Sequence, residues 1–378
     1  MFDESISEEV LLPLYYPPPI YVGGIVREET MKKERIIQLP KIYDERGNLS
    51  FIQPQMHLPF SIARCYWIYD VPGGEFRGSH AFRTQEEFIV ALSGSFDVLL
   101  DDGTQEHRYT LNRSYQGVYV PRMTWRTLEN FSTNSLCLVI SSTTYEEEDY
   151  IWDYTDFLSL KKTGTILPEN KALESIVDAL AVSNKKAAIS ALIAEQRATT
   201  DVDTSRVTST GDEVEIPRNS GADGVEKEVR KKVATSIVNS CETTVDDCML
   251  YQLPQDHSRQ GNLTALNNGE EIPFAIKRVF YLYDIPSGVT RGAHAHRKDT
   301  QFLVAASSSF DVRLFDGKRT RVVRLDQPNK GLLIPPGIWC QLVDFSSAAI
   351  CMTLTAREYE ETDYIRCYDD FMTFKKCK

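Results

Sequence analysis

Two histidines separated by one residue are the part of this chain best suited to do chemistry. His294 and His296 lie in the run RGAHAHR at 291–297, and side chains two residues apart in a β-strand point to the same face. The pKa of imidazole in water is about 6.5, so at neutral pH one ring can accept a proton while the other donates one. The pair, flanked by Arg291, therefore predicts proton transfer to and from a small molecule.

The same motif occurs earlier in the chain with one histidine missing. Residues 77–83 read RGSHAFR, so His80 is retained and Phe82 takes the place of the second histidine. The offset of 214 positions holds without a gap from 59–162 onto 273–376. One fold is therefore encoded twice, and the differences between the copies mark where chemistry has been kept or lost.

The residues around the histidines do not favour a metal centre. A metal site that begins with H-x-H usually adds a glutamate and, after a P-x-G turn, a further histidine. The second copy has Gln301 and Cys340 at those positions, and the first has Glu87 and Arg126. An amide is a poor ligand for a transition metal and a guanidinium is none. We therefore expect no metal and no other cofactor.

Each copy is patterned as short strands separated by turns. The run FDVRLF at 310–315 alternates apolar and polar residues, which is typical of a strand with one buried face. Asp-Gly pairs at 102–103 and 316–317 indicate hairpins. Many short strands with frequent turns predict an all-β fold: two tandem jelly-roll β-barrels joined by a partly helical linker.

The repeat divides the chain into four parts. Residues 35–162 form the first barrel domain and 246–378 the second. Before them, 1–34 form an N-terminal extension with a proline-rich run. Between them, 163–245 form a linker, with helical periodicity over 168–197 and a polar remainder.

Composition excludes several classes of partner. The net charge is −12 and the pI is about 5.1, which argues against nucleic acid and against an anionic membrane surface. No stretch of apolar residues is long enough to span a bilayer, and the acidic start MFDESISEEV is unlike a secretory signal. The eight cysteines show no C-x-x-C pair, so we expect free thiols and a cytoplasmic protein.

Arginine and aromatic residues share a face in another strand of each copy. Arg64 and Tyr66 lie in RCYWIYD, and Arg278 and Phe280 lie at the same positions of RVFYLYD. If these strands neighbour the histidine strands, each copy has a pocket wall with an arginine, an aromatic ring and one or two imidazoles.

The ordered run of motifs resembles one enzyme family. RGAHAHR, SFDVRLFDG, GLLIPPGIW, DFSSAAICMTL and YEETDYIRCYDDF are similar to those of dTDP-sugar 3,4-ketoisomerases, which are metal-independent cupins. The resemblance covers about 35–162 and about 246–376. It implies a dTDP-linked keto-deoxysugar, dTDP-4-keto-6-deoxyglucose, as substrate in deoxyamino-sugar biosynthesis. The ketone would move from carbon 4 to carbon 3 through an enediol, without a redox cofactor.

The resemblance also implies roles for individual residues. The catalytic histidine pair falls on His294 and His296, with His80 as the first copy's counterpart. The catalytic tyrosine falls on Tyr66, where the second copy has Phe280. The arginines that hold the nucleotide diphosphate fall on Arg278, Arg291 and Arg366, with Arg64 and Arg77 as first-copy equivalents. Trp339, equivalent to Trp125, either lines the site or packs in the barrel.

The two copies depart from the family pattern in different ways. The first has Trp152 where the second has Arg366, and its DERG turn carries Arg46 where the second reads SRQG with Gln260. Because the family forms homodimers of single cupins, the chain resembles a covalent pseudo-dimer with two unequal sites, which could associate further. We expect the second copy, with both imidazoles, to be the active one.

Two alternatives stay open. The substitutions Phe82 and Phe280 are compatible with a nucleotide-sugar-binding cupin that has lost catalysis. A 3,5-epimerase acts on the same sugar but usually pairs a histidine base with a tyrosine acid, and the copy with the histidine pair lacks the tyrosine.

Overall fold

The computed structural model describes residues 33–163 and 239–376. The first copy contains β1 (Arg35–Gln38), β2 (Asn48–Ile52), β3 (Arg64–Tyr69), β4 (Arg77–Phe82), β5 (Glu87–Ser93), β6 (Phe96–Asp101), β7 (Glu106–Leu111), β8 (Gln116–Val120), β9 (Trp125–Glu129), β10 (Leu136–Ser141), the 3-10 turn η2 (Glu147–Asp149), β11 (Tyr150–Ile151) and α1 (Tyr154–Thr163).

The second copy repeats this order and adds two elements, η3 and β13. It contains η3 (Val245–Asp247), β12 (Met249–Gln252), β13 (Gln255–Ser258), β14 (Gly261–Asn267), β15 (Arg278–Tyr283), β16 (Arg291–His296), β17 (Gln301–Ser307), β18 (Phe310–Phe315), β19 (Thr320–Leu325), β20 (Lys330–Ile334), β21 (Trp339–Val343), β22 (Ile350–Thr355), η4 (Glu361–Asp363), β23 (Tyr364–Ile365) and α4 (Tyr368–Lys376).

Each copy folds into a barrel of two sheets. In the first copy the larger sheet has the order β1-β8-β5-β10-β3-β14-β13 and the smaller one β11-β4-β9-β6-β7. In the second copy the orders are β12-β20-β17-β22-β15-β2 and β19-β18-β21-β16-β23. The predicted fold class, two tandem all-β cupin barrels, is confirmed.

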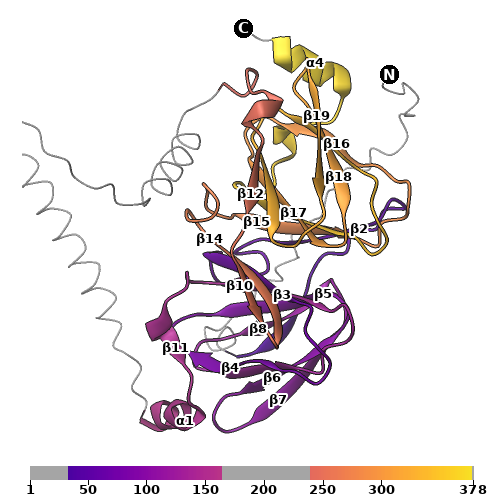
Figure 1. Cartoon of the computed structure of the whole chain (residues 1–378). Helices are drawn as coiled ribbons and strands as arrows, with labels where there is room; N and C mark the ends of the chain where they lie inside the picture. The colour runs from indigo at the N-terminus through magenta and orange to yellow at the C-terminus, as the bar shows by residue number, and fades with distance from the viewer. Residues whose placement is uncertain (1–32, 164–238, 377–378) are drawn as a thin grey trace, which may run out of the picture. The chain divides into compact units, whose positions relative to one another are not determined.

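The larger sheets exchange strands between the copies. β14 of the second copy pairs antiparallel with β3 of the first, with Ala265 opposite Tyr66 (Figure 1). In the same way β2 of the first copy pairs with β15 of the second, with Phe51 opposite Phe280. Neither larger sheet is therefore built from one copy alone.

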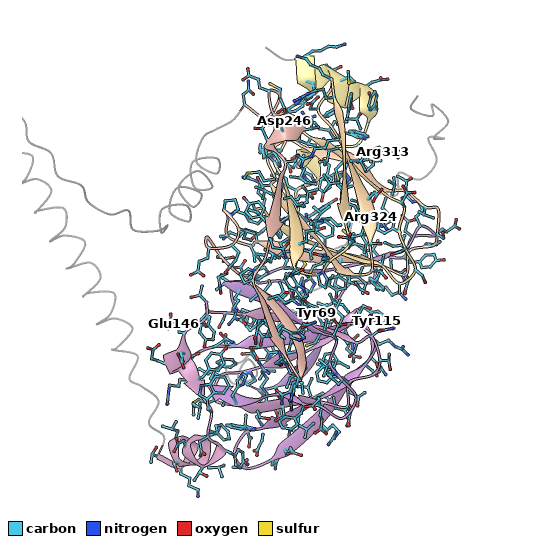
Figure 2. All side chains as sticks on the ribbon, viewed as in Figure 1. Tyr69, Tyr115, Glu146, Asp246, Arg313 and Arg324 are labelled. Carbon is cyan, nitrogen blue, oxygen red and sulfur yellow. The ribbon has the colours of Figure 1, made fainter. Side chains whose placement is uncertain are left out.

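The exchange is reinforced by side chains that repeat at the same offset. Asn262 donates its amide to Asp70 at 3.0 Å, and Asn48 donates to Asp284 at 2.9 Å. The Tyr69 hydroxyl, labelled in Figure 2, meets the Thr264 hydroxyl at 3.1 Å. Each of these contacts joins one copy to the other.

One apolar core continues through both copies. The largest cluster of buried side chains includes Trp67 and Phe88 from the first copy and Tyr281 and Phe302 from the second. The Trp67 indole donates to the carbonyl of Pro328 at 3.0 Å, so a large aromatic of one copy is anchored on the backbone of the other. Burial of this shared apolar surface stabilises the two barrels together.

The smaller sheets show the alternation expected from sequence. Along β18, Phe310, Val312 and Leu314 are buried, whereas the polar residues between them are partly exposed. Arg313 on β18 and Arg324 on β19 are labelled in Figure 2, and Arg324 forms an ion pair with Asp311 at 2.8 Å. Apolar side chains thus line the inside of the barrel and ion pairs cover the outside.

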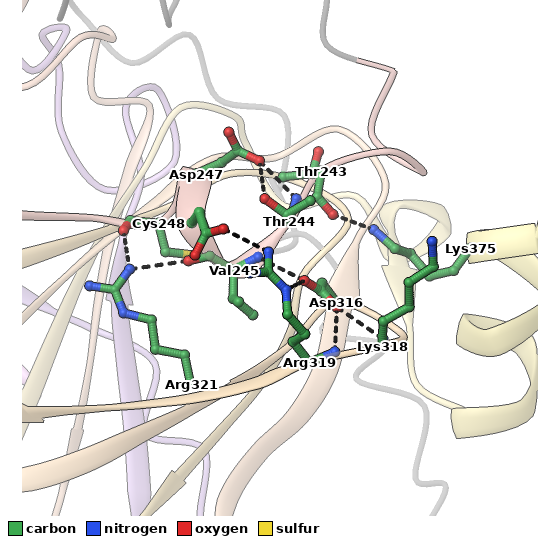
Figure 3. Close-up of polar contacts among 11 residues, drawn as sticks. Thr243, Thr244, Val245, Asp247, Cys248, Asp316, Lys318, Arg319, Arg321 and Lys375 are labelled. Atoms are coloured by element: carbon green, nitrogen blue, oxygen red, sulfur yellow. Dashed lines mark hydrogen bonds and ion pairs between the residues drawn. The ribbon is translucent and has the colours of Figure 1, made fainter.

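A polar anchor fixes the start of the second copy to its barrel (Figure 3). The Asp316 carboxylate accepts the Val245 backbone N–H at 3.1 Å, and Arg321 donates to the carbonyls of Val245 and Cys248 at 3.1 and 2.7 Å. From α4, Lys375 donates to the Thr243 carbonyl at 2.6 Å. This short segment therefore ties the β18–β19 hairpin to the C-terminal helix.

Residues 1–32 of the N-terminal extension and the helical periodicity over 168–197 lie outside the described residues. Within the described part of the chain, no helix is long and apolar enough to cross a membrane.

Substitution of Asp316 tests the anchor. Asp316 accepts N–H groups from Lys318 and Arg319 within its hairpin as well as from Val245. The equivalent Asp102 bonds Thr104 and Gln105 of its own hairpin. We expect Asp316→Ala to lower the free energy of unfolding by about 1–3 kcal/mol more than Asp102→Ala, because it also leaves a buried N–H unpaired.

Thermal unfolding followed by circular dichroism measures this difference. Equal losses in the two variants would show that the contact to Val245 does not stabilise the second copy.

Candidate active site

A bulge before each histidine motif sets the direction of the imidazoles. In β16 the register with β21 shifts between Gly292 and His294. Gly292 has φ +80°, and a Cβ atom there would lie 3.0 Å from the Cys340 carbonyl oxygen, so glycine is favoured. Beyond the bulge the strand alternates, which places His294 and His296 on one side and Ala295 on the other.

The two imidazoles of the second barrel lie together, as their spacing predicts. Their ring centroids are 5.0 Å apart, and both rings contact Tyr364, at 5.1 Å from His294 and 4.3 Å from His296. His296 is buried, whereas His294 keeps part of its surface exposed. His294 is therefore the imidazole that can meet a ligand.

His296 is held by hydrogen bonds at both ring nitrogens. Its Nδ1 lies 2.8 Å from the Asp363 carboxylate, and its Nε2 lies 2.9 Å from the amide nitrogen of Gln301. An amide nitrogen only donates, so Nε2 accepts and the Nδ1–H donates to Asp363. Asp363 also accepts the backbone N–H groups of Lys298 and Asp299. This network fixes both the orientation and the tautomer of His296.

Burial lowers the pKa of both imidazoles below that of a free ring, which favours their neutral forms. Loss of solvent around His294 lowers its pKa to about 3, and His296, Arg366 and Arg278 add to this shift. Burial also lowers the pKa of His296, although the hydrogen bond and charge of Asp363 oppose the shift. Any acid role for this pair therefore uses the N–H of a neutral ring, or a proton that has just been taken from a substrate.

Two of the predicted arginines contact Tyr364, the ring that both imidazoles pack against. Arg278 is buried, donates to the Tyr364 hydroxyl at 3.2 Å, and has its guanidinium 5.2 Å from the Phe280 ring. Arg366 lies over the Tyr364 ring at 4.3 Å and forms an ion pair with Glu361 at 2.8 Å. Arg278 and Arg366 are thus close enough to His294 for their charges to lower its pKa, and the carboxylate of Glu361 lies beside Arg366.

The third predicted arginine, Arg291, forms an ion pair with a residue of the first copy. Arg291 pairs with Asp44 of the first copy at 2.9 Å, and Asp44 also accepts two side-chain hydrogen bonds from Arg46. Hydrogen bonds from Arg46 and the charge of Arg291 hold the pKa of Asp44 well below its ordinary value. The DERG turn therefore brings an additional guanidinium, that of Arg46, close to the second barrel.

The first barrel holds a different set of polar groups. The Tyr66 hydroxyl donates to Glu87 at 2.7 Å and accepts from Arg126 at 2.7 Å, while Arg126 also forms an ion pair with Glu87 at 2.5 Å. His80 is surrounded by aromatic rings, including Phe82 at 4.9 Å. Burial and the charge of Arg126 lower the pKa of His80 well below its ordinary value.

Arg64 and Arg77 occupy the places of Arg278 and Arg291. The Arg64 guanidinium lies 5.0 Å from the Tyr66 ring. Arg77 donates to the Ser258 hydroxyl of the second copy at 2.9 Å, where Arg291 meets the Asp44 carboxylate. The cross-copy contact is thus present on both sides, but the hydrogen-bonded partner is a carboxylate only at the second barrel; at the first, the partner is a hydroxyl and the charge of Asp256 acts on Arg77.

Trp339 lies away from the imidazoles. It is 5% exposed and contacts Tyr368 and Phe371 of α4 at centroid distances of 5.7 and 5.4 Å. Its apolar cluster includes Ala295, which points to the opposite face of β16 from the histidines. The packing role is favoured by these contacts, and we leave Trp339 out of the proposed site.

Two carboxylates that contact predicted site residues were not identified from sequence. Asp363 and Asp44 contact His296 and Arg291 across 67 and 247 positions, and no local pattern links them. The recurrence of Asp149 as Asp363, and the change from DERG to SRQG, were the available signals.

Comparison with known proteins gives two matches within this chain. Residues 32–162 and 246–376 each match the family described as FdtA: WxcM-like, C-terminal. A TDP-4-oxo-6-deoxy-alpha-D-glucose-3,4-oxoisomerase from Aneurinibacillus thermoaerophilus is 43% identical over 115 residues, which is 30% of this chain and 83% of that protein.

The solved structures that this chain is similar to include a 3,4-ketoisomerase from Helicobacter canadensis. The two share 33% sequence identity, the match covers 34% of this chain and 98% of that chain, and the TM-score is 0.34. Another is a sugar 3,4-ketoisomerase from Thermoanaerobacterium thermosaccharolyticum in complex with TDP. It shares 33% sequence identity, the match covers 34% of this chain and 94% of that chain, and the TM-score is 0.34.

Asp299 gives the site a testable pH dependence. It is 2% exposed, and burial raises its pKa to about 7. A carboxyl whose pKa is raised on folding contributes stability at low pH that is lost as pH rises through the folded pKa. We therefore expect Asp299→Asn to match the wild type near pH 4 and to exceed it at pH 8 by on the order of 3 kcal/mol.

Chemical denaturation at a series of pH values measures this difference. Asp156→Asn, which replaces an exposed carboxylate, is the control. A gap between Asp299→Asn and wild type that does not grow with pH would contradict a buried, ionising Asp299.

Proposed function

The chain belongs to the FdtA (WxcM-like, C-terminal) family, with two copies of its domain, and from this premise we propose that it is a TDP-4-keto-6-deoxyglucose 3,4-ketoisomerase whose catalytic site is the second barrel. The observation that carries the proposal is the pair of imidazoles, one immobilised by Asp363 and one partly exposed, beside a buried guanidinium. The sequence similarity to a curated 3,4-oxoisomerase supports the choice of reaction.

The reaction moves two protons within the substrate, one from carbon 3 to carbon 4 and one from the oxygen on carbon 3 to the oxygen on carbon 4, so it needs no external oxidant or reductant. A base removes the proton on carbon 3, and the C–H electron pair forms the carbon 3–carbon 4 double bond while the oxygen on carbon 4 gains a proton. The enediol then loses the proton on the carbon 3 oxygen, the ketone forms at carbon 3, and carbon 4 takes up a proton. The product is an isomer of the substrate, with a ketone where an aminotransferase could act.

His294 is the proposed base because it is neutral and partly exposed. Its low pKa in the free protein reflects the loss of solvent and nearby positive charge. The negative charge of an enediolate would favour the imidazolium and raise that pKa at the moment of proton transfer. The same imidazole can then deliver the proton to carbon 4.

His296 is the proposed partner of His294, acting as a positioning residue. Hydrogen bonds to Asp363 and Gln301 occupy both of its nitrogens, and its ring packs at 5.0 Å from His294. Arg278 supplies the fixed positive charge that stabilises the enediolate. The Arg278 guanidinium need not move to do so, because it is already buried between Phe280 and Tyr359.

The nucleotide diphosphate is proposed to bind Arg291, Arg366 and Arg46. Arg366 is partly exposed and Arg46 is largely exposed. Arg366 pairs with Glu361, whereas Arg46 and Arg291 both pair with Asp44. A diphosphate can replace those carboxylates as the bidentate partner of a guanidinium. The first copy thus contributes a substrate-binding residue to the second barrel.

Matched histidine variants test which barrel reacts. We expect His294→Asn to reduce isomerisation by about 100-fold or more, the range for loss of a general base, and His80→Asn to change it by less than about threefold. Proton NMR of TDP-4-keto-6-deoxyglucose in deuterated buffer follows loss of the carbon 3 proton and identifies the product. Loss of activity in His80→Asn alone would place the reaction in the first barrel.

The same spectra discriminate the other functions. Exchange at carbon 5 would indicate an epimerase, and binding without exchange would indicate a protein that has lost catalysis.

A second substitution tests the contribution across the copies. Arg46→Gln reproduces the glutamine found at Gln260, and we expect it to raise KM on the order of tenfold while kcat changes less, because a charge-assisted hydrogen bond to phosphate is lost. Arg113→Gln, at an exposed arginine, is the control. An unchanged KM in Arg46→Gln would remove Arg46 from the site.

A further inference from the structure

The first barrel contains buried polar atoms that have no partner. Among the described residues, neither ring nitrogen of His80 and neither Nε nor Nη1 of Arg64 has a hydrogen-bond partner. The two side chains belong to residues that are only 7% and 8% exposed. Buried polar groups are normally paired, so a cluster of unpaired ones marks a place where a ligand supplies the partners.

Exposed aromatic rings lie against these unpaired groups. Trp152 stacks on Tyr150 at 4.7 Å with an interplanar angle of 12°, and its ring is 5.1 Å from His80. Trp152 is 58% exposed, and Tyr145, whose ring lies 5.2 Å from the Arg64 guanidinium, is 50% exposed. The unpaired atoms are thus bordered by flat aromatic surfaces that a nucleobase or a sugar ring can cover.

The charge of the first barrel fits a diphosphate. Glu87 is neutralised by Arg126, so that pair adds no net charge. Arg77 meets the hydroxyl of Ser258, whereas Arg291 at the second barrel meets a carboxylate. Among the described residues, the contacts of Arg64 are with the rings of Tyr66 and Tyr145 rather than with a carboxylate, so its charge remains for an anionic ligand, whereas the charge of Asp256 already acts on Arg77.

The groups that would catalyse isomerisation are missing or occupied in the first barrel. Phe82 takes the place of His296. Asp149, which corresponds to Asp363, accepts hydrogen bonds from Thr84 and from the backbone of Gln85. The Tyr66 hydroxyl is bonded to both Glu87 and Arg126. A ligand bound there meets one imidazole that neither a second imidazole nor a carboxylate positions.

We infer that the first barrel is a second binding site for a nucleoside-diphosphate sugar, which it holds without isomerising it. The inference rests on the proposed function for the identity of the ligand class, but binding can be measured independently of turnover. Each chain then carries one reacting site and one site that only binds, and the two are joined through the exchanged strands.

Titration calorimetry of the full chain with TDP tests the binding. We expect two TDP molecules per wild-type chain and one per chain in each of the matched variants Arg64→Met and Arg278→Met. Thermal unfolding checks that both variants are folded. Trp152→Phe provides a second measurement, because TDP should quench less tryptophan fluorescence when this exposed ring is absent.

One TDP per wild-type chain would overturn the inference, as would an unchanged stoichiometry in folded Arg64→Met together with unchanged quenching in Trp152→Phe. Loss of isomerisation in His80→Asn would also overturn it, because the first barrel would then be catalytic. If two TDP molecules bind but no keto sugar is converted, the proposed function fails and the second binding site stands.

Discussion

The pairing of β14 with β3, and of β2 with β15, is the constraint on which the rest of this structure depends. The larger sheet of the first copy takes β14 and β13 from the second, the larger sheet of the second takes β2 from the first, and one apolar core continues through both. The same connection brings Asp44 and Arg46 to Arg291. A change in the first copy can therefore alter the second site without touching its histidines.

The two barrels satisfy their interior polar groups in different ways. In the first, Tyr66, Glu87 and Arg126 form a charged network. At the equivalent positions the second has Phe280, Gln301 and Cys340, and Gln301 bonds His296 instead. The three residues differ together between the copies, because substitution of Glu87 or Arg126 alone would leave the other charge buried without its partner, which is destabilising. Divergence of the copies is thus physically coupled across several strands.

Much of the fold could be predicted from sequence, because strands and turns are encoded locally. Alternation along 310–315, the Asp-Gly turns and the fixed offset between copies indicated two all-β barrels, and this is confirmed. The H-x-H spacing also indicated that His294 and His296 share a face, and their rings do lie together.

Contacts between distant segments could not be predicted in this way. A strand that pairs with the other copy has the same alternation of apolar and polar residues as a strand that pairs within its own copy. The sequence pattern therefore does not reveal the strand exchange. Asp363 and Asp44 reach the site only through the fold, and the position of Trp339 depends on which face of β21 meets α4. The roles assigned to the site residues stay predictions.

We propose above all that the second barrel binds its substrate with residues from both copies. A crystal structure of the full chain with TDP bound tests it most directly. We predict a diphosphate in the second barrel that contacts Arg46 of the first copy together with an arginine of the second. A diphosphate held there by residues of the second copy alone, with Arg46 still turned to Asp44, would contradict it.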